Sequence, residues 1–182
     1  MIMHTLTSGQ DMYVPWVEPI AYANAFQAWP SFSMLMPRSE YNGSDPVYVT
    51  VEEDDTVTAS FTWSQASELL EASGRNDAAD MVTLMNAAGY DTTVDPMVNN
   101  MMCWYTSDIS TEESYVFNTS DLRNEPEILY GFGDGVGTVA TLDVCKSWDP
   151  SRTTVQEFSN ISHSAYMTDE TIVGMLVDLF TS

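Results

Sequence analysis

The fold is decided by residues 129–148, which read LYGFGDGVGTVATLDVCKSW. Four alternate glycines, from Gly131 to Gly137, follow the apolar triplet 128–130. Glycine adopts the positive φ values that sharp turns require, so the pattern predicts a tight loop just beyond the end of a strand. The spacing is not that of a dinucleotide fingerprint, and no Gly-Lys-Ser or Gly-Lys-Thr follows as in a phosphate loop. We therefore interpret this stretch as a strand-end turn and not as a nucleotide site.

The composition is that of an ordinary globular chain with a strong acidic bias. The 182 residues are 44% apolar, enough for one domain with a sizeable core. There are 27 acidic and only five basic side chains, and the net charge of -22 disfavours nucleic acid as a partner. The run 52–55, EEDD, lacks the spaced oxygen ligands and the turn glycine of a calcium loop, so we read it as a solvated loop. No metal and no cofactor are expected.

The sequence gives mixed indications about the cell compartment. No stretch of 18 apolar residues occurs, so no transmembrane segment is expected, and residues 1–4 do not begin like a signal peptide. Three acceptor sequons for N-glycosylation stand at Asn42, Asn118 and Asn160. Because Ser and Thr are abundant, chance explains the sequons about as well as glycosylation does.

Hydrophobic periodicity predicts three strands and three helices. The expected strands are 46–51, 98–105 and 155–158. The expected helices are 64–74, 77–88 and 168–180. Ser64, Asn76 and either Thr168 or Asp169 are the expected N-caps, and Gly74 and Gly89 the expected helix ends. The last helix has an apolar face that needs a sheet to cover it; its members are Ile172, Val173, Leu176, Leu179 and Phe180.

His163 lies between the last expected strand and the last expected helix. An imidazole at such a place can act as general base toward a hydroxyl and then as general acid toward a leaving group. From the residues alone, a surface histidine is the more frequent explanation of a single histidine in a loop. His4 has no comparable context.

The two cysteines, Cys103 and Cys145, are too few for a disulfide scaffold and too far apart for a metal knuckle. The residues alone leave two free thiols and one bridge as comparable alternatives.

Residues 129–148 resemble the acid-loop segment of the lecithin:cholesterol acyltransferase family, where GDGDGTV precedes a short helix that ends in Cys and then Trp. The second Asp of that string is the acid of the family's catalytic triad; Val136 stands there in this chain, and Asp134 matches the first Asp. Residues 6–11, LTSGQD, and 29–37, WPSFSMLMP, resemble strings that follow the family's nucleophile half. The resemblance extends from about residue 6 to residue 180.

The resemblance implies an α/β class chain with an incomplete α/β-hydrolase fold, in which 1–95 are cap, lid and linker and 96–182 the carboxyl-terminal part of the core. It implies a disulfide between Cys103 and Cys145 and places His163 at the catalytic histidine. Asp134 is the candidate acid, provided that the loop shifts to bring it to His163. No G-x-S-x-G elbow occurs in the sequence, so the serine nucleophile and its oxyanion donors are expected to be missing.

The function implied is that of a fragment or degenerate member of a family of serine acyltransferases and phospholipases, inactive alone. The parent reaction moves an acyl group from a phospholipid to a sterol, a diacylglycerol or water. Trp16, Trp29 and residues 34–36 are candidates to face lipid, although core packing explains them equally well. The implied partners are a phospholipid or other lipid ester and either the missing amino-terminal half or a second copy, in a secreted or lumenal location. The alternative is a non-catalytic domain of the same fold that binds lipid or protein.

Overall fold

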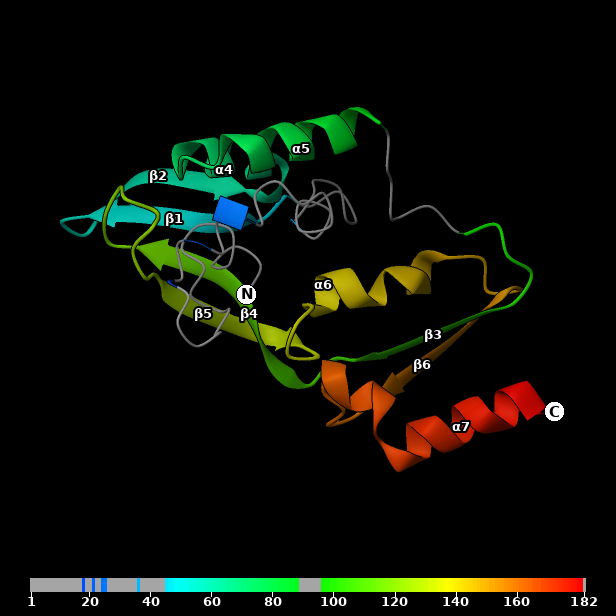
Figure 1. The fold of residues 1–182 in the computed structure, drawn as a ribbon. Helices are drawn as coiled ribbons and strands as arrows, with labels where there is room; N and C mark the ends of the chain where they lie inside the picture. Colours follow the sequence, from blue (N-terminus) through cyan, green and yellow to red (C-terminus); the bar gives the residue numbers. More distant parts are fainter. Residues whose placement is uncertain are drawn as a thin grey trace. The chain divides into compact units, whose positions relative to one another are not determined.

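A computed structural model describes residues 45–88 and 96–181, together with Glu18, Ala21, Asn24, Ala25 and Met36. The chain is mixed α/β, as Figure 1 shows. It divides into two compact units, each of which is built from two segments. The first unit is Met1–Thr92 with Ser114–Leu129, and the second is Thr93–Glu113 with Tyr130–Ser182.

A four-stranded sheet in the order β2-β1-β4-β5 links segments far apart in sequence. Its strands are β1 (Val47–Glu53), β2 (Thr56–Thr62), β4 (Ile109–Phe117) and β5 (Glu127–Gly133). β1 pairs antiparallel with β2 and parallel with β4. The predicted strand 46–51 is confirmed as β1, and the strand expected before the glycine loop is confirmed as β5. β2 and β4 were not predicted.

The acidic run 52–55 ends β1 and forms the turn to β2: Glu52 and Glu53 are the last residues of β1, and Asp54 and Asp55 make the turn. Asp54 and Asp55 have φ values of 51° and 59°, and both side chains are exposed. Two consecutive residues with positive φ are typical of the turn that matches the twist of a two-stranded hairpin, and aspartate tolerates this conformation. The expectation of a solvated loop is therefore confirmed for Asp54 and Asp55, whereas it is wrong for Glu52 and Glu53, which lie in β1.

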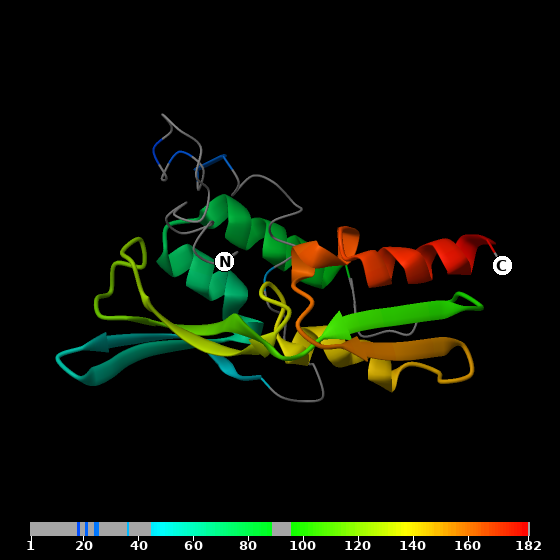
Figure 2. The same cartoon turned by 90° about the horizontal axis from the view of Figure 1, so that it is seen from below.

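Helices α4 (Ala66–Ala72) and α5 (Asn76–Ala87) follow the short 3-10 turn η1 (Trp63–Gln65) and lie over one face of the β1–β2 hairpin, as Figures 1 and 2 show. Apolar side chains from these helices and from β1 are buried. They are Val49, Val51, Leu69, Leu70, Ala78, Ala79 and Val82. The two helices were predicted at these places, and the positive φ of 75° at Gly74 confirms the stop between them.

The predicted N-caps of these helices are wrong. Ser64 lies inside η1, and Asp45 accepts bonds from its backbone N–H at 2.8 Å and its hydroxyl at 2.6 Å. Asn76 is the first residue of α5, whose N-cap is Arg75. Gly89, the expected end of α5, lies outside the described residues.

The second unit contains a parallel pair of strands, β3 (Met101–Thr106) and β6 (Thr153–Phe158), with Cys103 opposite Val155. Within the described residues neither strand has a second neighbour. Helix α6 (Val139–Leu142) and the 3-10 turn η2 (Asp143–Ser147) lie on one side of the pair and helix α7 (Glu170–Thr181) on the other, in both Figure 1 and Figure 2. The predicted strands 98–105 and 155–158 are confirmed with shifted starts.

Helix α7 begins at the predicted cap and leaves much of its apolar face uncovered. Asp169 Oδ1 accepts the backbone N–H groups of Thr171 at 3.0 Å and Ile172 at 3.1 Å, which confirms Asp169 as the N-cap. Ile172 is buried, whereas Val177 is 54% and Phe180 83% exposed. No helix among the described residues has the length and hydropathy needed to cross a bilayer.

A disulfide between Cys103 in β3 and Cys145 in η2 confirms the bridge that the resemblance implied. Their Cα atoms are 6.3 Å apart, and Cys145 is buried. The bridge fixes the segment after the glycine loop to the strand pair. It is compatible with a secreted or lumenal location, where disulfides persist.

Replacing both cysteines with alanine should lower the free energy of unfolding by about 4 kcal/mol, the chain-entropy value for a loop of this length, since the bonded residues are 42 positions apart. Guanidinium chloride denaturation of the double variant and the wild type measures the difference. Wild type treated with a reductant should match the variant, and equal stability of oxidised wild type and variant would contradict the expectation.

Candidate functional site

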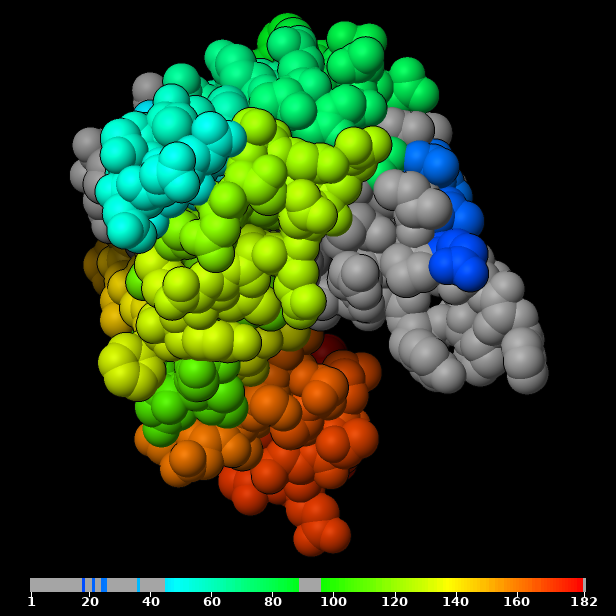
Figure 3. Space-filling model, turned by 90° about the vertical axis from the view of Figure 1, so that its left-hand side faces the viewer, coloured from blue at the N-terminus to red at the C-terminus, as the bar shows by residue number. Residues whose placement is uncertain are grey.

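The structure brings His163 and Asp134 together within the second unit. Asp134 follows the last residue of β5, and His163 is the first residue of η3 (His163–Met167). His163 Nδ1 lies 2.8 Å from Asp134 Oδ2. The Asp134 side chain is only 4% exposed, whereas that of His163 is 59% exposed. The segment of η3 and α7, orange to red in Figure 3, lies at the molecular surface.

The carboxylate of Asp134 also closes its own loop. Its Oδ1 accepts the backbone N–H groups of Val136 at 3.0 Å and Gly137 at 2.8 Å. The Asp134 backbone N–H donates to the carbonyl of Gly137, and its carbonyl accepts the N–H of His163 at 2.8 Å. Hydrogen bonds to an ionised acceptor are stronger than neutral ones, so this set holds a buried carboxylate in one orientation.

Glycine is required at two positions of this loop. A Cβ on Gly133 would lie 2.0 Å from the carbonyl oxygen of Gly137, a backbone atom that closes the turn. Gly135 has φ of 93°, which disfavours residues with a side chain. The sequence-based interpretation of the glycine stretch as a tight turn beyond a strand is therefore confirmed.

The position of the acid fixes how the imidazole is protonated. A carboxylate can only accept hydrogen bonds, so a neutral His163 donates from Nδ1 and carries its lone pair on Nε2. A ring held in this tautomer, with Nε2 directed away from the acid, is the arrangement of a general base in hydroxyl-activating dyads and triads.

Aromatic side chains support the segment that carries the histidine. The Tyr166 hydroxyl in η3 lies 2.8 Å from Thr106 Oγ1 in β3. The ring of Phe158 packs edge-on against Tyr166 and Trp104. Burial raises the pKa of Tyr166, so its phenol stays neutral and holds η3 on the strand pair.

Position 136 takes no part in the contact with His163. Val136 is 44% exposed, and its backbone N–H, rather than its side chain, faces the Asp134 carboxylate. The loop that the sequence suggested would have to shift already presents Asp134 to His163. Whether this acid acts in catalysis stays a prediction. The lipid-facing candidates Trp16, Trp29, Met34 and Leu35 lie outside the described residues, and Met36 is buried.

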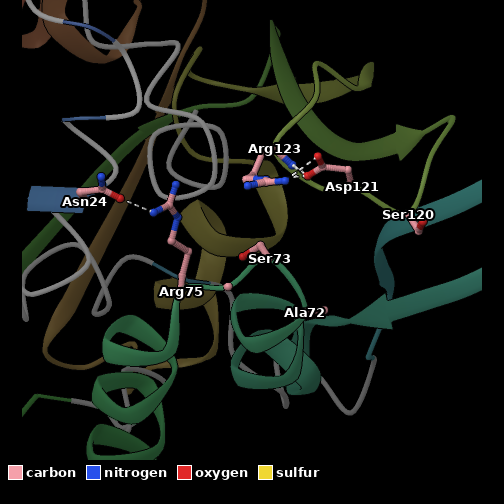
Figure 4. A pocket seen from close by; sticks show the side chains of 8 residues that line it. Asn24, Ala72, Ser73, Arg75, Ser120, Asp121 and Arg123 are labelled. Atoms are coloured by element: carbon pink, nitrogen blue, oxygen red, sulfur yellow. Dashed lines mark hydrogen bonds and ion pairs between the residues drawn. The ribbon is translucent and has the colours of Figure 1, made fainter.

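A separate hollow in the first unit, shown in Figure 4, has a volume of about 530 Å³. Arg75 Nη1 donates to Asn24 Oδ1 at 2.6 Å, and Arg123 binds both oxygens of Asp121 at 2.7 and 2.8 Å. The Arg123 guanidinium lowers the pKa of Asp121 to about 2. Because these cations already bind oxygens, the hollow offers no acid–base pair. In the described part of the chain no cluster of three or more His, Cys, Asp or Glu is placed to hold a metal ion.

Comparison with known proteins supports the resemblance found in the glycine stretch. No family model matches the chain. Lecithin-cholesterol acyltransferase-like 1 of Arabidopsis thaliana is 25% identical over 177 residues, which are 92% of this chain and 37% of that protein. The protein of the same name from Oryza sativa subsp. japonica is 23% identical over 180 residues, 97% of this chain and 40% of that protein. The chain therefore spans about two fifths of the length of these relatives.

Substituting Gly133 with alanine should destabilise the protein by at least about 2 kcal/mol, because the added methyl group meets backbone that cannot move without opening the loop. Gly174, in the interior of α7, has nothing within 4 Å of a built Cβ and is the matched control. Gly174→Ala should stabilise by about 0.5–1 kcal/mol through helix propensity. Chemical denaturation compares the two; a Gly133→Ala protein as stable as wild type would show that the loop is not closed as described.

Proposed function

We propose that this chain supplies the acid and the general base of a serine acyltransferase or phospholipase that acts on lipid esters. The observation that carries the proposal is the 2.8 Å contact between His163 Nδ1 and the buried Asp134 carboxylate. The name that the two plant relatives share, together with their alignment over nearly all of this chain, supports a lipid acyl ester as substrate.

The reaction would proceed in two half-reactions. In the first, Nε2 of His163 removes the proton of a serine hydroxyl as the oxygen attacks the ester carbonyl, and then gives that proton to the departing alcohol. An acyl group is left on the serine. In the second, His163 deprotonates an incoming lipid alcohol or water, and the acyl group leaves the serine as a new ester or a free acid.

Asp134 would hold the ring and stabilise the imidazolium in each half-reaction. Its oxygens have separate tasks, since Oδ1 is bound by two backbone amides and Oδ2 faces the imidazole. An acid of this kind stays ionised throughout and acts by orientation and charge. Val136, at the position of the family's acid, would have no role in proton transfer.

The nucleophile would come from another polypeptide segment, because the sequence holds no G-x-S-x-G elbow. The strand pair β3–β6 offers a place for it: parallel strands normally have further strands beside them, yet this pair has none in the described residues. The partner we propose is the amino-terminal portion of the longer relatives, in a secreted or lumenal compartment. Without it, we expect self-association through the open edges.

The purified chain alone should not hydrolyse a short-chain ester or a phospholipid in vesicles, because neither elbow nor oxyanion donors are provided. Co-expression with the amino-terminal portion of the Arabidopsis thaliana relative should raise the solubility of the chain and produce ester turnover. His163→Ala should abolish that turnover. Turnover by the isolated chain that this substitution abolishes would reveal a nucleophile within these 182 residues.

In the co-expressed complex, Asp134→Asn should reduce kcat by roughly ten-thousand-fold, the loss seen when the carboxylate of a Ser-His-Asp triad becomes an amide. Val136→Asp should leave kcat unchanged, because the site at His163 Nδ1 is occupied. The two variants add or remove one acidic group within the same loop and so control for charge. If Val136→Asp raised turnover and Asp134→Asn did not lower it, the acid would belong at position 136.

A non-catalytic domain that binds lipid or protein is the second candidate, and the exposed apolar face of α7 favours it. Gel filtration and equilibrium unfolding distinguish the two. The chain would be a self-sufficient binding domain if it were monomeric, unfolded cooperatively and kept the same stability when the amino-terminal portion was added. That result would refute the acyltransferase proposal.

A further inference from the structure

We infer that Thr111 is a positioning residue that keeps the Asp134 carboxylate turned toward His163. Its chemical consequence rests on the proposed function, whereas its effect on the state of the His163 ring does not. No sequence pattern singles out Thr111, which lies in β4, 23 residues before Asp134.

The Thr111 hydroxyl is buried and has a defined direction. Thr111 is 1% exposed. Its Oγ1 lies 3.0 Å from the carbonyl oxygen of Ile109, to which it donates, and accepts the backbone N–H of Gly135 at 2.9 Å. A hydroxyl has a single proton, so donation to Ile109 leaves the lone pairs for Gly135.

The bond to Gly135 acts on the peptide unit that joins Gly135 to Asp134. Three successive amides of the loop are engaged: that of Gly135 by Thr111, and those of Val136 and Gly137 by Asp134 Oδ1. Thr111 holds the peptide plane between Asp134 and Gly135, and the two loop amides hold Asp134 Oδ1. The carboxylate is thereby oriented with Oδ2 toward His163 Nδ1.

Removing only the hydroxyl should release this constraint. Without it, the amide of the exposed Gly135 would lose its acceptor within the protein, and the peptide unit could turn toward water or another acceptor. Gly135 already has φ of 93°, and glycine allows such a rotation at small steric cost. The Asp134 carboxylate would then swing with its backbone and leave Nδ1.

The experiment compares Thr111→Val with Thr111→Ser, which keeps the hydroxyl, and with Thr153→Val. Thr153 lies in β6 of the same unit, is 9% exposed, and its hydroxyl finds no hydrogen-bond partner among the described residues. It therefore controls for the loss of a buried threonine. The measurement is the nitrogen and carbon NMR spectrum of the imidazole rings, which reports the share of each tautomer. The chain has two histidines, and His4→Gln assigns the signals.

We expect His163 to be mainly the Nδ1–H tautomer in the wild type, Thr111→Ser and Thr153→Val, and to lose this dominance in folded Thr111→Val. An unchanged tautomer in folded Thr111→Val, or the same loss in Thr153→Val, would overturn the inference. If Thr111→Val does not fold, a Thr111→Ser protein that loses the Nδ1–H tautomer would overturn it, and one that keeps the tautomer would support it.

In the co-expressed complex, Thr111→Val should reduce kcat about tenfold with KM unchanged, and Thr111→Ser should restore it. Absence of turnover in every complex, with the tautomer shift intact, would remove the proposed function and leave the role of Thr111 standing.

Discussion

The buried carboxylate of Asp134 is the group on which the candidate site depends. A chain with a net charge of -22 gains nothing from hiding one more negative charge, and a desolvated carboxylate is costly unless it is bound on several sides. Two backbone amides and one imidazole meet that requirement. The bonds that compensate for burying the Asp134 carboxylate also close the glycine turn and orient His163. The same three hydrogen bonds therefore determine the shape of the loop and the orientation of the imidazole.

These bonds explain why Asp134, and not residue 136, faces His163. The side chain that folds back on the amides of residues 136 and 137 is that of Asp134. Once Asp134 occupies that place, residue 136 presents its N–H inward and its side chain outward, where valine is tolerated. The identity of residue 136 is thereby separated from the state of the imidazole.

The sequence predicted those parts of the fold in which local periodicity and burial agree. β1, α4, α5 and α7 follow their apolar spacing, and Asp169 caps α7 from two residues away. β4 was missed because Glu112 and Glu113 interrupt its apolar pattern, and β2 because a hairpin turn of two aspartates is a weak local signal. Ser64 was misread as a cap since its partner, Asp45, lies 19 residues earlier. The glycine turn and His163 could likewise be found from the sequence. The orientation of the Asp134 carboxylate could not, because it depends on contacts between residues 24 and 29 positions apart.

The contacts that orient His163 lie close together, and this bears on how a partner segment could bind. Every contact that orients His163 comes from the second unit: the acid loop, Thr111 behind it, and Thr106 and Phe158 beneath η3. The disulfide ties this set to β3, which has no strand beside it other than β6 in the described residues and where the proposed partner would add strands. Adding strands there extends the hydrogen-bonded ladder without breaking any bond within the dyad. Under the proposed function, Asp134 and His163 would therefore be oriented before the serine of a partner segment arrives, and the partner's binding energy would serve to place that serine.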